Sequence, residues 1–170
     1  MRALLDGRQT ILLRKGGIGE KRFEVAANEF LLFPTVAHSH AQRVRPEHRD
    51  MLTEAAADST EDQVTLRAAA KVVATVAVNR PERLPEIEDL HIWTAESVRA
   101  DRLDFRPKHQ LAVLVVSAIP LVEPVRLTRT PDYAGCTSWV QLPTTPRLAA
   151  PVYTAADLAG IAARVRAAVA

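Results

Sequence analysis

The longest apolar stretch of the sequence, residues 111–119, constrains the fold more than any other feature. It reads LAVLVVSAI and holds one polar side chain, Ser117. A continuous run of leucine and β-branched residues of this length favours a strand whose two faces are both covered by other parts of the protein. We therefore expect a central strand in a sheet that carries helices on its faces.

Shorter segments rich in β-branched and apolar residues add strands to this sheet. The segments at residues 11–13 and 31–33 flank a charged loop, and we expect them to pair as a hairpin across it. Pro34 ends the second segment because proline has no N–H to donate to a ladder. The remaining strands are predicted at residues 72–78, 124–128 and 138–142.

Helices are predicted where apolar residues recur every three to four positions. Near the end of the chain, Thr154 and Asp157 have the spacing of a capping box and precede an apolar stripe, which predicts an amphipathic helix over residues 155–168. Further helices are predicted at residues 46–57, 82–90 and 95–103. Together these elements predict a single α+β domain over residues 1–170, with a curved mixed sheet or a small β-barrel and helices packed outside.

Composition excludes several classes of protein. Apolar residues make up 48% of the chain and charged residues 25%, which is the balance of a globular domain rather than of a disordered one. Lys and Arg outnumber Asp and Glu only 22 to 20, so net charge alone does not demand a nucleic acid. The single cysteine, Cys136, leaves no internal disulfide, and we expect a cytoplasmic protein with no membrane partner.

A strand end rich in cations is the first candidate binding site. Arg14 and Lys15 are followed directly by Gly16 and Gly17, and Glu20 stands three positions further on. Glycines let backbone N–H groups approach an anion closely, and a guanidinium offers a planar fork of donors. The alternative interpretation is a charged hairpin turn that needs glycine for a positive φ.

Histidines and a tryptophan form the second group of candidates. Thr35 precedes His38 and His40, which would share one face of an extended strand. Two histidines without a third ligand do not make a metal site, so we expect no metal and no cofactor. His91 and Trp93 stand together later in the chain, where the indole ring could stack on a base or fill the core.

A third group of uncommon residue types surrounds a glycine turn. It contains Tyr133, Gly135, Cys136, Ser138 and Trp139. A nucleophilic thiol needs a lowered pKa and a neighbouring base, and the sequence shows neither beside Cys136. We predict a structural thiol there and take Tyr133 and Trp139 as candidate ligand contacts.

These motifs occur in an order that resembles the bacterial family called domain of unknown function 1802. The matching segments read LRKGGIxE, FLLFPTxxH, HxWT and YxGCxSW, and they extend over residues 3–142. Four ordered motifs make chance agreement improbable. The resemblance implies a shared site without implying a chemistry, and it adds Pro34, Gly135 and Cys136 to the candidate positions.

A more distant similarity concerns the small barrel domains called ASCH, of the pseudouridine-synthase-and-archaeosine-transglycosylase-like superfamily. Gly7 and Arg14 fall where those domains carry the outer residues of the motif Gly-x-Lys-x-x-Glu-x-Arg. The lysine and the glutamate of that motif are replaced here by Gln9 and Leu12. The barrel form of the expected fold rests on this analogy.

The preferred hypothesis is a binding module for nucleic acid or a nucleotide-like anion. In that reading Arg14 and Lys15 hold phosphate, and Trp93 or Trp139 stacks on a base. An open basic groove with an exposed aromatic ring would favour it.

The alternative hypothesis is a small hydrolase or transferase. His38 or His91 would act as general base, Glu20 as its partner, and Arg14 would stabilise developing negative charge. A dry pocket that brings these residues together would favour it. We prefer the binding module because no nucleophile and base can be paired by their spacing.

Overall fold

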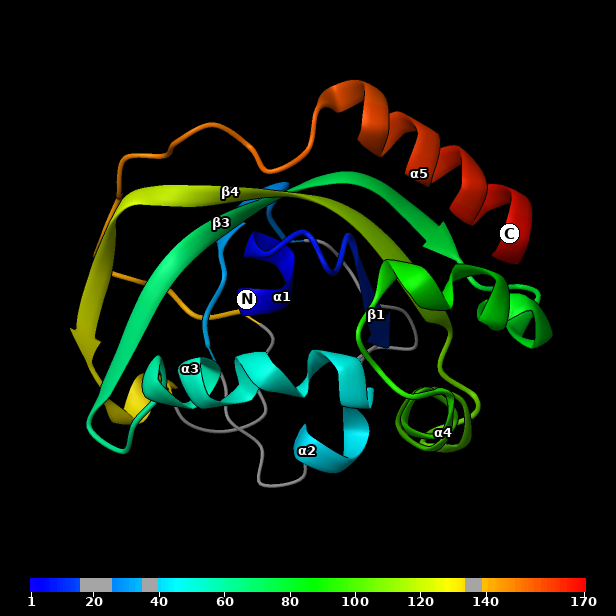
Figure 1. Cartoon of the computed structure of the whole chain (residues 1–170), viewed down its shortest axis with the longest axis horizontal. Coiled ribbons are helices and arrows are strands. Elements are labelled where there is room, and N and C mark those ends of the chain that lie inside the picture. Colours follow the sequence, from blue (N-terminus) through cyan, green and yellow to red (C-terminus); the bar gives the residue numbers. More distant parts are fainter. Residues whose placement is uncertain (16–25, 35–39, 134–138) are drawn as a thin grey trace.

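The computed structural model describes residues 1–15, 26–34, 40–133 and 139–170, and a four-stranded antiparallel sheet lies at its centre. Figure 1 shows two of the strands as long ribbons that curve together through most of the molecule. The described strands leave the sheet open, with β1 at one edge and β2 at the other, so of the two predicted forms the curved sheet is confirmed. In sequence order the strands are β1 (Ile11–Lys15), β2 (Glu29–Leu31), β3 (Gln63–Ala77) and β4 (Leu111–Thr128), and their order in the sheet is β1-β4-β3-β2.

Helices cover both sides of the curved sheet. In Figure 1, β3 and β4 arch over α1 and α3, and α5 lies on the opposite side of the arch. No helix among the described residues is long and apolar enough to cross a bilayer. The α-helices are α1 (Arg2–Leu5), α2 (His40–Arg43), α3 (Leu52–Ala57), α4 (Ala95–Val98) and α5 (Ala155–Val169). The other helices are the 3₁₀ segments η1 (Pro46–Met51), η2 (Pro81–Leu90) and η4 (Pro131–Tyr133) and the π-helix η3 (Arg99–Asp104).

The first half of β4 is the buried central strand that the sequence predicts. Every residue from 111 to 119 is buried, and this stretch has β1 on one side and β3 on the other. Val113 and Val115 pack with residues of α5 and η2. Leu114 points to the opposite face and packs with Leu4 of α1. Because both faces are covered, the strand has no polar face and its sequence does not alternate.

The terminal helix α5 has the predicted capping box and apolar stripe. Thr154 Oγ1 accepts a hydrogen bond from the N–H of Asp157 at 3.2 Å, and the Asp157 carboxylate accepts from the N–H of Thr154 at the same distance. Leu158 and Val165 are buried against the sheet and η2. The predicted helix over residues 46–57 also forms, divided into η1 and α3.

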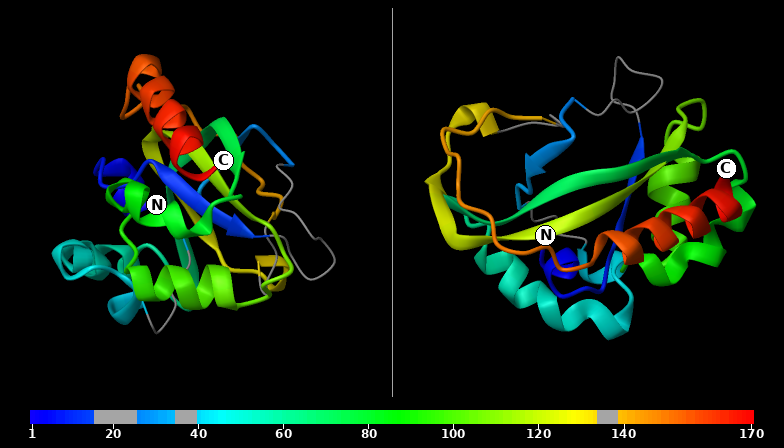
Figure 2. Two further views of the ribbon diagram at one scale, coloured as in Figure 1. Left: turned by 90° about the vertical axis from the view of Figure 1, so that its right-hand side faces the viewer. Right: turned by 90° about the horizontal axis from the view of Figure 1, so that it is seen from above.

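The predicted hairpin between the first two strands is wrong. β1 and β2 lie at opposite edges of the sheet, and Figure 2 shows β3 and β4 between them. β1 instead pairs with β4 in the register Ile11↔Val115 to Lys15↔Leu111. Ile11 and Leu13 are both buried, and the central strand with its covering helices supplies the apolar environment that they require.

Strand bounds differ from the prediction mainly because β3 and β4 are longer than their apolar cores. β4 continues through Pro120 and Pro124 to Thr128, so residues 124–128 are not a separate strand. Beyond β1, the backbone of residues 147–152 hydrogen-bonds to this part of β4, and the carbonyl of Pro120 accepts from Ala149 at 2.9 Å. Residues 139–142 do not form the predicted strand, and β2 covers residues 29–31 rather than 31–33.

Candidate functional site

The residues singled out in the sequence fall at three places in the described structure. Arg14 and Lys15 end β1, and His91 and Trp93 follow η2. Tyr133 ends η4, after β4, and Trp139 follows it in the chain. Pro34 lies after β2, where it is buried and its carbonyl accepts a hydrogen bond from Ser59 Oγ at 3.1 Å. The remaining candidates lie outside the described residues, namely Gly16, Gly17, Glu20, Thr35, His38, Gly135 and Cys136.

Two adjoining cavities lie beside the end of β1. The smaller has a volume of about 90 Å³ and the larger about 160 Å³. Because several residues border both cavities, we treat them as one cleft and call it the basic cleft. The shared residues are Leu13, Asp101 and Arg102. The smaller cavity adds Arg43, Trp93, Ser97 and Val98, and the larger adds Arg14, Lys15, Phe105 and Arg106.

Positive charge dominates the basic cleft. Among the residues that the structure describes, its lining includes four arginines and one lysine but a single carboxylate, Asp101. That carboxylate already forms an ion pair with Arg43 at 3.3 Å. Burial and the neighbouring Arg102 guanidinium lower the pKa of Arg14. Burial also lowers the pKa of Arg102, and Asp101 raises it while Arg43 lowers it further. Two arginines of the cleft therefore carry their charge in partly desolvated surroundings.

Lys15 is engaged by the backbone of the cleft wall. Its Nζ donates to the carbonyl of Arg102 at 2.6 Å, of Leu103 at 3.4 Å and of Phe105 at 2.5 Å. An ammonium group has three N–H donors, and these three acceptors use them. Lys15 thus secures the last turn of η3, and its three N–H donors are engaged within the chain.

The backbone beside Lys15 has two uncommon conformations. Arg99–Asp104 is a π-helix, and the N–H of Phe105 bonds to the carbonyl of Ala100 at 3.1 Å. Arg106 follows with a φ of 51°, in the left-handed region that few residues other than glycine adopt. The guanidinium carbon of Arg106 lies 5.0 Å from the ring centroid of Phe105, and the Phe105 ring is exposed.

Sequence reasoning missed four residues of this site. Neither a π-helix nor a left-handed arginine has a signal in residue spacing, so nothing in the sequence joined Phe105 and Arg106 to β1. Arg43 and Arg102 come from segments far apart in the chain. Of the four, only Arg102 lies in a predicted helix, that over residues 95–103, whose polar residues were expected to share a face.

His91 and Trp93 have separate roles although they are two residues apart. Trp93 is half-buried and lines the smaller cavity. The His91 side chain is buried, and its Nδ1 accepts a hydrogen bond from the N–H of Trp93 at 3.2 Å. Burial, with a further contribution from Arg45, lowers the pKa of His91 to about 4. At neutral pH this histidine is uncharged and holds the backbone of the segment that carries Trp93.

Tyr133 and Trp139 pack against the β2 side of the sheet rather than in the basic cleft. The Tyr133 ring meets Phe33 edge-on at 5.4 Å between centroids, and Trp139 meets Phe30 of β2 at 5.0 Å. Arg129 lies over the Phe33 ring at 5.9 Å. The structure therefore brings Arg14, Lys15 and Trp93 together and places Tyr133 and Trp139 at the other edge of the sheet.

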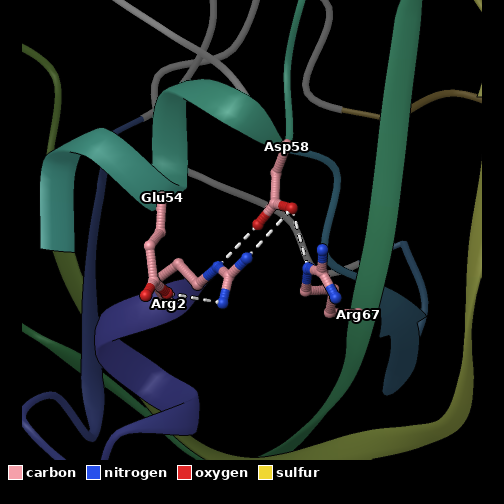
Figure 3. Close-up of polar contacts among 4 residues, drawn as sticks. All are labelled: Arg2, Glu54, Asp58 and Arg67. Atoms are coloured by element: carbon pink, nitrogen blue, oxygen red, sulfur yellow. Dashed lines mark hydrogen bonds and ion pairs between the residues drawn. The ribbon is translucent and has the colours of Figure 1, made fainter.

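A second group of arginines lies around Asp58, and Figure 3 shows it. Arg2 Nε donates to Asp58 Oδ2 at 2.6 Å, and Arg67 Nε donates to Asp58 Oδ1 at 2.7 Å. Arg2 also pairs with Glu54 at 2.9 Å. We call these four residues the Asp58 cluster. It joins α1, the end of α3 and β3, and its two arginines face two carboxylates.

Comparisons with known proteins identify a family and no activity. A family model described as domain of unknown function (DUF1802) matches residues 1–164 of the chain. No curated protein and no solved structure matches it. The match confirms the resemblance that the four motifs indicate, and the chemistry has to be inferred from the site.

Proposed function

The chain belongs to the family described as domain of unknown function (DUF1802), and we propose that it is a binding module for nucleic acid or a nucleotide-like anion. The observation that carries this proposal is the charge of the basic cleft, whose described lining residues comprise five cations and one carboxylate. A cleft with such an excess of half-buried positive charge is suited to an anionic ligand.

Arginine predominates among these cations, which favours phosphate as the anion. A guanidinium can donate two parallel hydrogen bonds to phosphate oxygens, and partial burial strengthens such bonds. Arg102 borders both cavities, so a phosphate bound there would lie between them. Trp93 lines one cavity and offers a ring to a base beside that phosphate.

The shape of the cleft supports binding rather than catalysis. Enclosed sites for small molecules commonly have volumes of roughly 300–1,000 Å³. The two cavities here are about 90 and 160 Å³, so they suit parts of an extended ligand better than a whole enclosed substrate. Among the described residues no specific contact favours the hydrolase or transferase alternative, because the Nδ1 of His91 is engaged by the backbone.

Fluorescence anisotropy with labelled oligonucleotides tests the proposal. Single-stranded and double-stranded probes are titrated with the protein at several salt concentrations, and Arg14→Ala and Arg102→Ala are measured in parallel. Each phosphate contact contributes about one unit to the slope of log affinity against log salt. Each variant should therefore weaken binding and flatten this slope by about one unit.

Arg126→Ala is the matched control, because Arg126 is an exposed arginine of β4 that does not line the cleft. It should leave both affinity and salt slope unchanged. Circular dichroism checks that each variant is folded. Absence of binding by the native protein, or equal binding by folded Arg14→Ala and Arg102→Ala, would refute the proposal.

A further inference from the structure

We infer that the ligand of the basic cleft is a single strand of nucleic acid, with a base stacked on Phe105 and the neighbouring phosphate at Arg102. This inference rests on the proposed function and narrows it to one class of ligand. It also assigns a role to an aromatic residue outside the sequence motifs. Three features of the cleft support it.

The first feature is an exposed aromatic ring that is held in place. The Phe105 residue is 57% exposed, the largest fraction among the exposed large hydrophobic residues that the structure describes. Arg106 covers one side of the ring at 5.0 Å, and Lys15 holds the Phe105 carbonyl at 2.5 Å. A ring fixed before binding loses little conformational entropy when a flat ligand stacks on it.

The second feature is the uncommon backbone conformation of the segment that carries Phe105. π-helical turns are rare, and a left-handed conformation is strained for any residue other than glycine. Both occur within the short segment from Arg99 to Arg106. Such conformations concentrate at ligand sites because the surrounding contacts must enforce them. Here the contacts of Lys15 with three carbonyls of the segment do so.

The third feature is the order of groups along the cleft. Phe105 lines the larger cavity, Trp93 lines the smaller one, and Arg102 borders both. Two aromatic rings on either side of a shared guanidinium match the order base, phosphate, base along one strand. Stacking of bases on aromatic rings over a positively charged groove is a general way to bind single strands.

A duplex does not meet these requirements. In a duplex the faces of the bases are stacked on one another, so an aromatic side chain can reach them only in unpaired or extruded nucleotides. The cleft is also recessed, whereas reading a duplex groove calls for a helix or strand that projects into it.

Competition experiments with the full chain separate stacking from charge. The probes are a short oligothymidine strand, an abasic strand of the same length, a duplex of the same length and inorganic tripolyphosphate. The native protein should bind the oligothymidine strand about tenfold or more tightly than the abasic strand or the duplex. Phe105→Ala should lower its affinity for oligothymidine roughly 5- to 150-fold, the range for one stacked base, and leave affinity for the abasic strand unchanged.

Two control variants make the result specific. Phe105→Tyr keeps an aromatic face and should restore tight binding of oligothymidine. Val122→Ala removes an exposed apolar side chain outside the cleft and should change nothing. Circular dichroism confirms that each variant is folded.

The outcomes distinguish this inference from the proposed function. If Phe105→Ala binds oligothymidine as tightly as the native protein, or if the duplex binds as tightly as the single strand, base stacking in the cleft is refuted. Should Arg102→Ala still weaken binding of tripolyphosphate and the abasic strand in that case, the anion site stands. If the native protein binds none of the four probes, the proposed function fails and the inference fails with it.

Discussion

The Asp58 cluster and the basic cleft both gather arginines, and they differ in what opposes the charge. In the cluster, Arg2 and Arg67 share the carboxylate of Asp58, which is 1% exposed, and Arg2 also reaches Glu54. In the cleft, the described lining residues comprise five cations and one carboxylate. The first group completes its charge pairing within the chain. For the second group we propose an anionic ligand.

From this difference we propose a structural role for the Asp58 cluster and a binding role for the basic cleft. The Asp58 cluster ties α1 to α3 through pairs more than fifty positions apart in sequence, and Arg67 joins β3 to the same carboxylate. The cleft places its arginines at the end of an edge strand, in the π-helix η3 and at the left-handed residue that follows it. Residue type alone does not separate these roles, whereas the balance of charge around each arginine does.

Removal of the central carboxylate should have the largest effect on stability. Asp58→Ala leaves two arginines without the buried charge that they share, and we expect a loss of about 3–5 kcal/mol in the free energy of unfolding. Urea denaturation followed by circular dichroism measures it. Glu61→Ala, at an exposed neighbouring position, should change this free energy by less than about 0.5 kcal/mol. A comparably small loss for Asp58→Ala would show that the Asp58 cluster does not have the structural role assigned to it.

The buried histidine beside Trp93 predicts a dependence of stability on pH. The pKa of His91 is about 4 in the folded protein and 6.5 in an unfolded chain. Between these values the unfolded state binds the proton more readily, so stability is intact above pH 6.5 and decreases as pH falls toward 4. The total loss from this residue is roughly 3 kcal/mol.

His91→Gln isolates that contribution, because an amide oxygen can still accept from the backbone and does not titrate. Urea unfolding at a series of pH values should show a shallower decrease for this variant between pH 6.5 and 4. Parallel curves for the native protein and the variant would contradict the assignment.

Substitution of Lys15 should have a smaller effect on stability and should also weaken binding. Lys15→Met keeps the apolar stem and removes hydrogen bonds to two carbonyls of η3 and to the carbonyl of Phe105, which follows it, and we expect a loss of about 1–3 kcal/mol in the free energy of unfolding. Because η3 positions Arg102, Phe105 and Arg106, affinity for tripolyphosphate should fall too. Urea denaturation and competition binding measure the two effects. Stability equal to that of the native protein would show that Lys15 does not secure the π-helix.

Arg102 should contribute least to stability although it stands at the centre of the cleft. Arg102→Met removes a half-buried cation that lies among other cations, and the free energy of unfolding should change by less than about 1 kcal/mol or rise. The same urea measurements test this. A loss as large as that of Asp58→Ala would place Arg102 among the structural arginines.

The sequence predicts most elements of the fold because their signals are local. Residues 111–119 predict the central strand, and Thr154 with Asp157 predicts the start of α5. The pairing of the strands is harder to predict from the sequence. The order of strands depends on burial of Ile11 and Leu13 against β4 rather than on proximity in the chain. The prolines of β4 indicate a break between two strands, but β4 is continuous. Residues 147–152 hydrogen-bond to it beyond the end of β1.

The candidate site was predicted in part. Arg14, Lys15 and Trp93 do line one cleft, and the cations beside a strand end were a readable signal. Arg43, Arg102, Phe105 and Arg106 were missed because their approach to β1 depends on tertiary packing and on an unusual helix. Tyr133 and Trp139 were grouped with the same site by their place in the family motifs, and motif order says nothing about distance in space.

Stabilisation by a phosphate ligand tests the central claim that the basic cleft holds an anion. Urea unfolding of the native protein is measured with and without tripolyphosphate, at ionic strength matched with sodium chloride. Ligand at about a hundred times its dissociation constant should raise the free energy of unfolding by roughly 2.7 kcal/mol. The increase should vanish in Arg102→Met and persist in Arg126→Ala. No increase for the native protein, or an equal increase for Arg102→Met, would contradict the account.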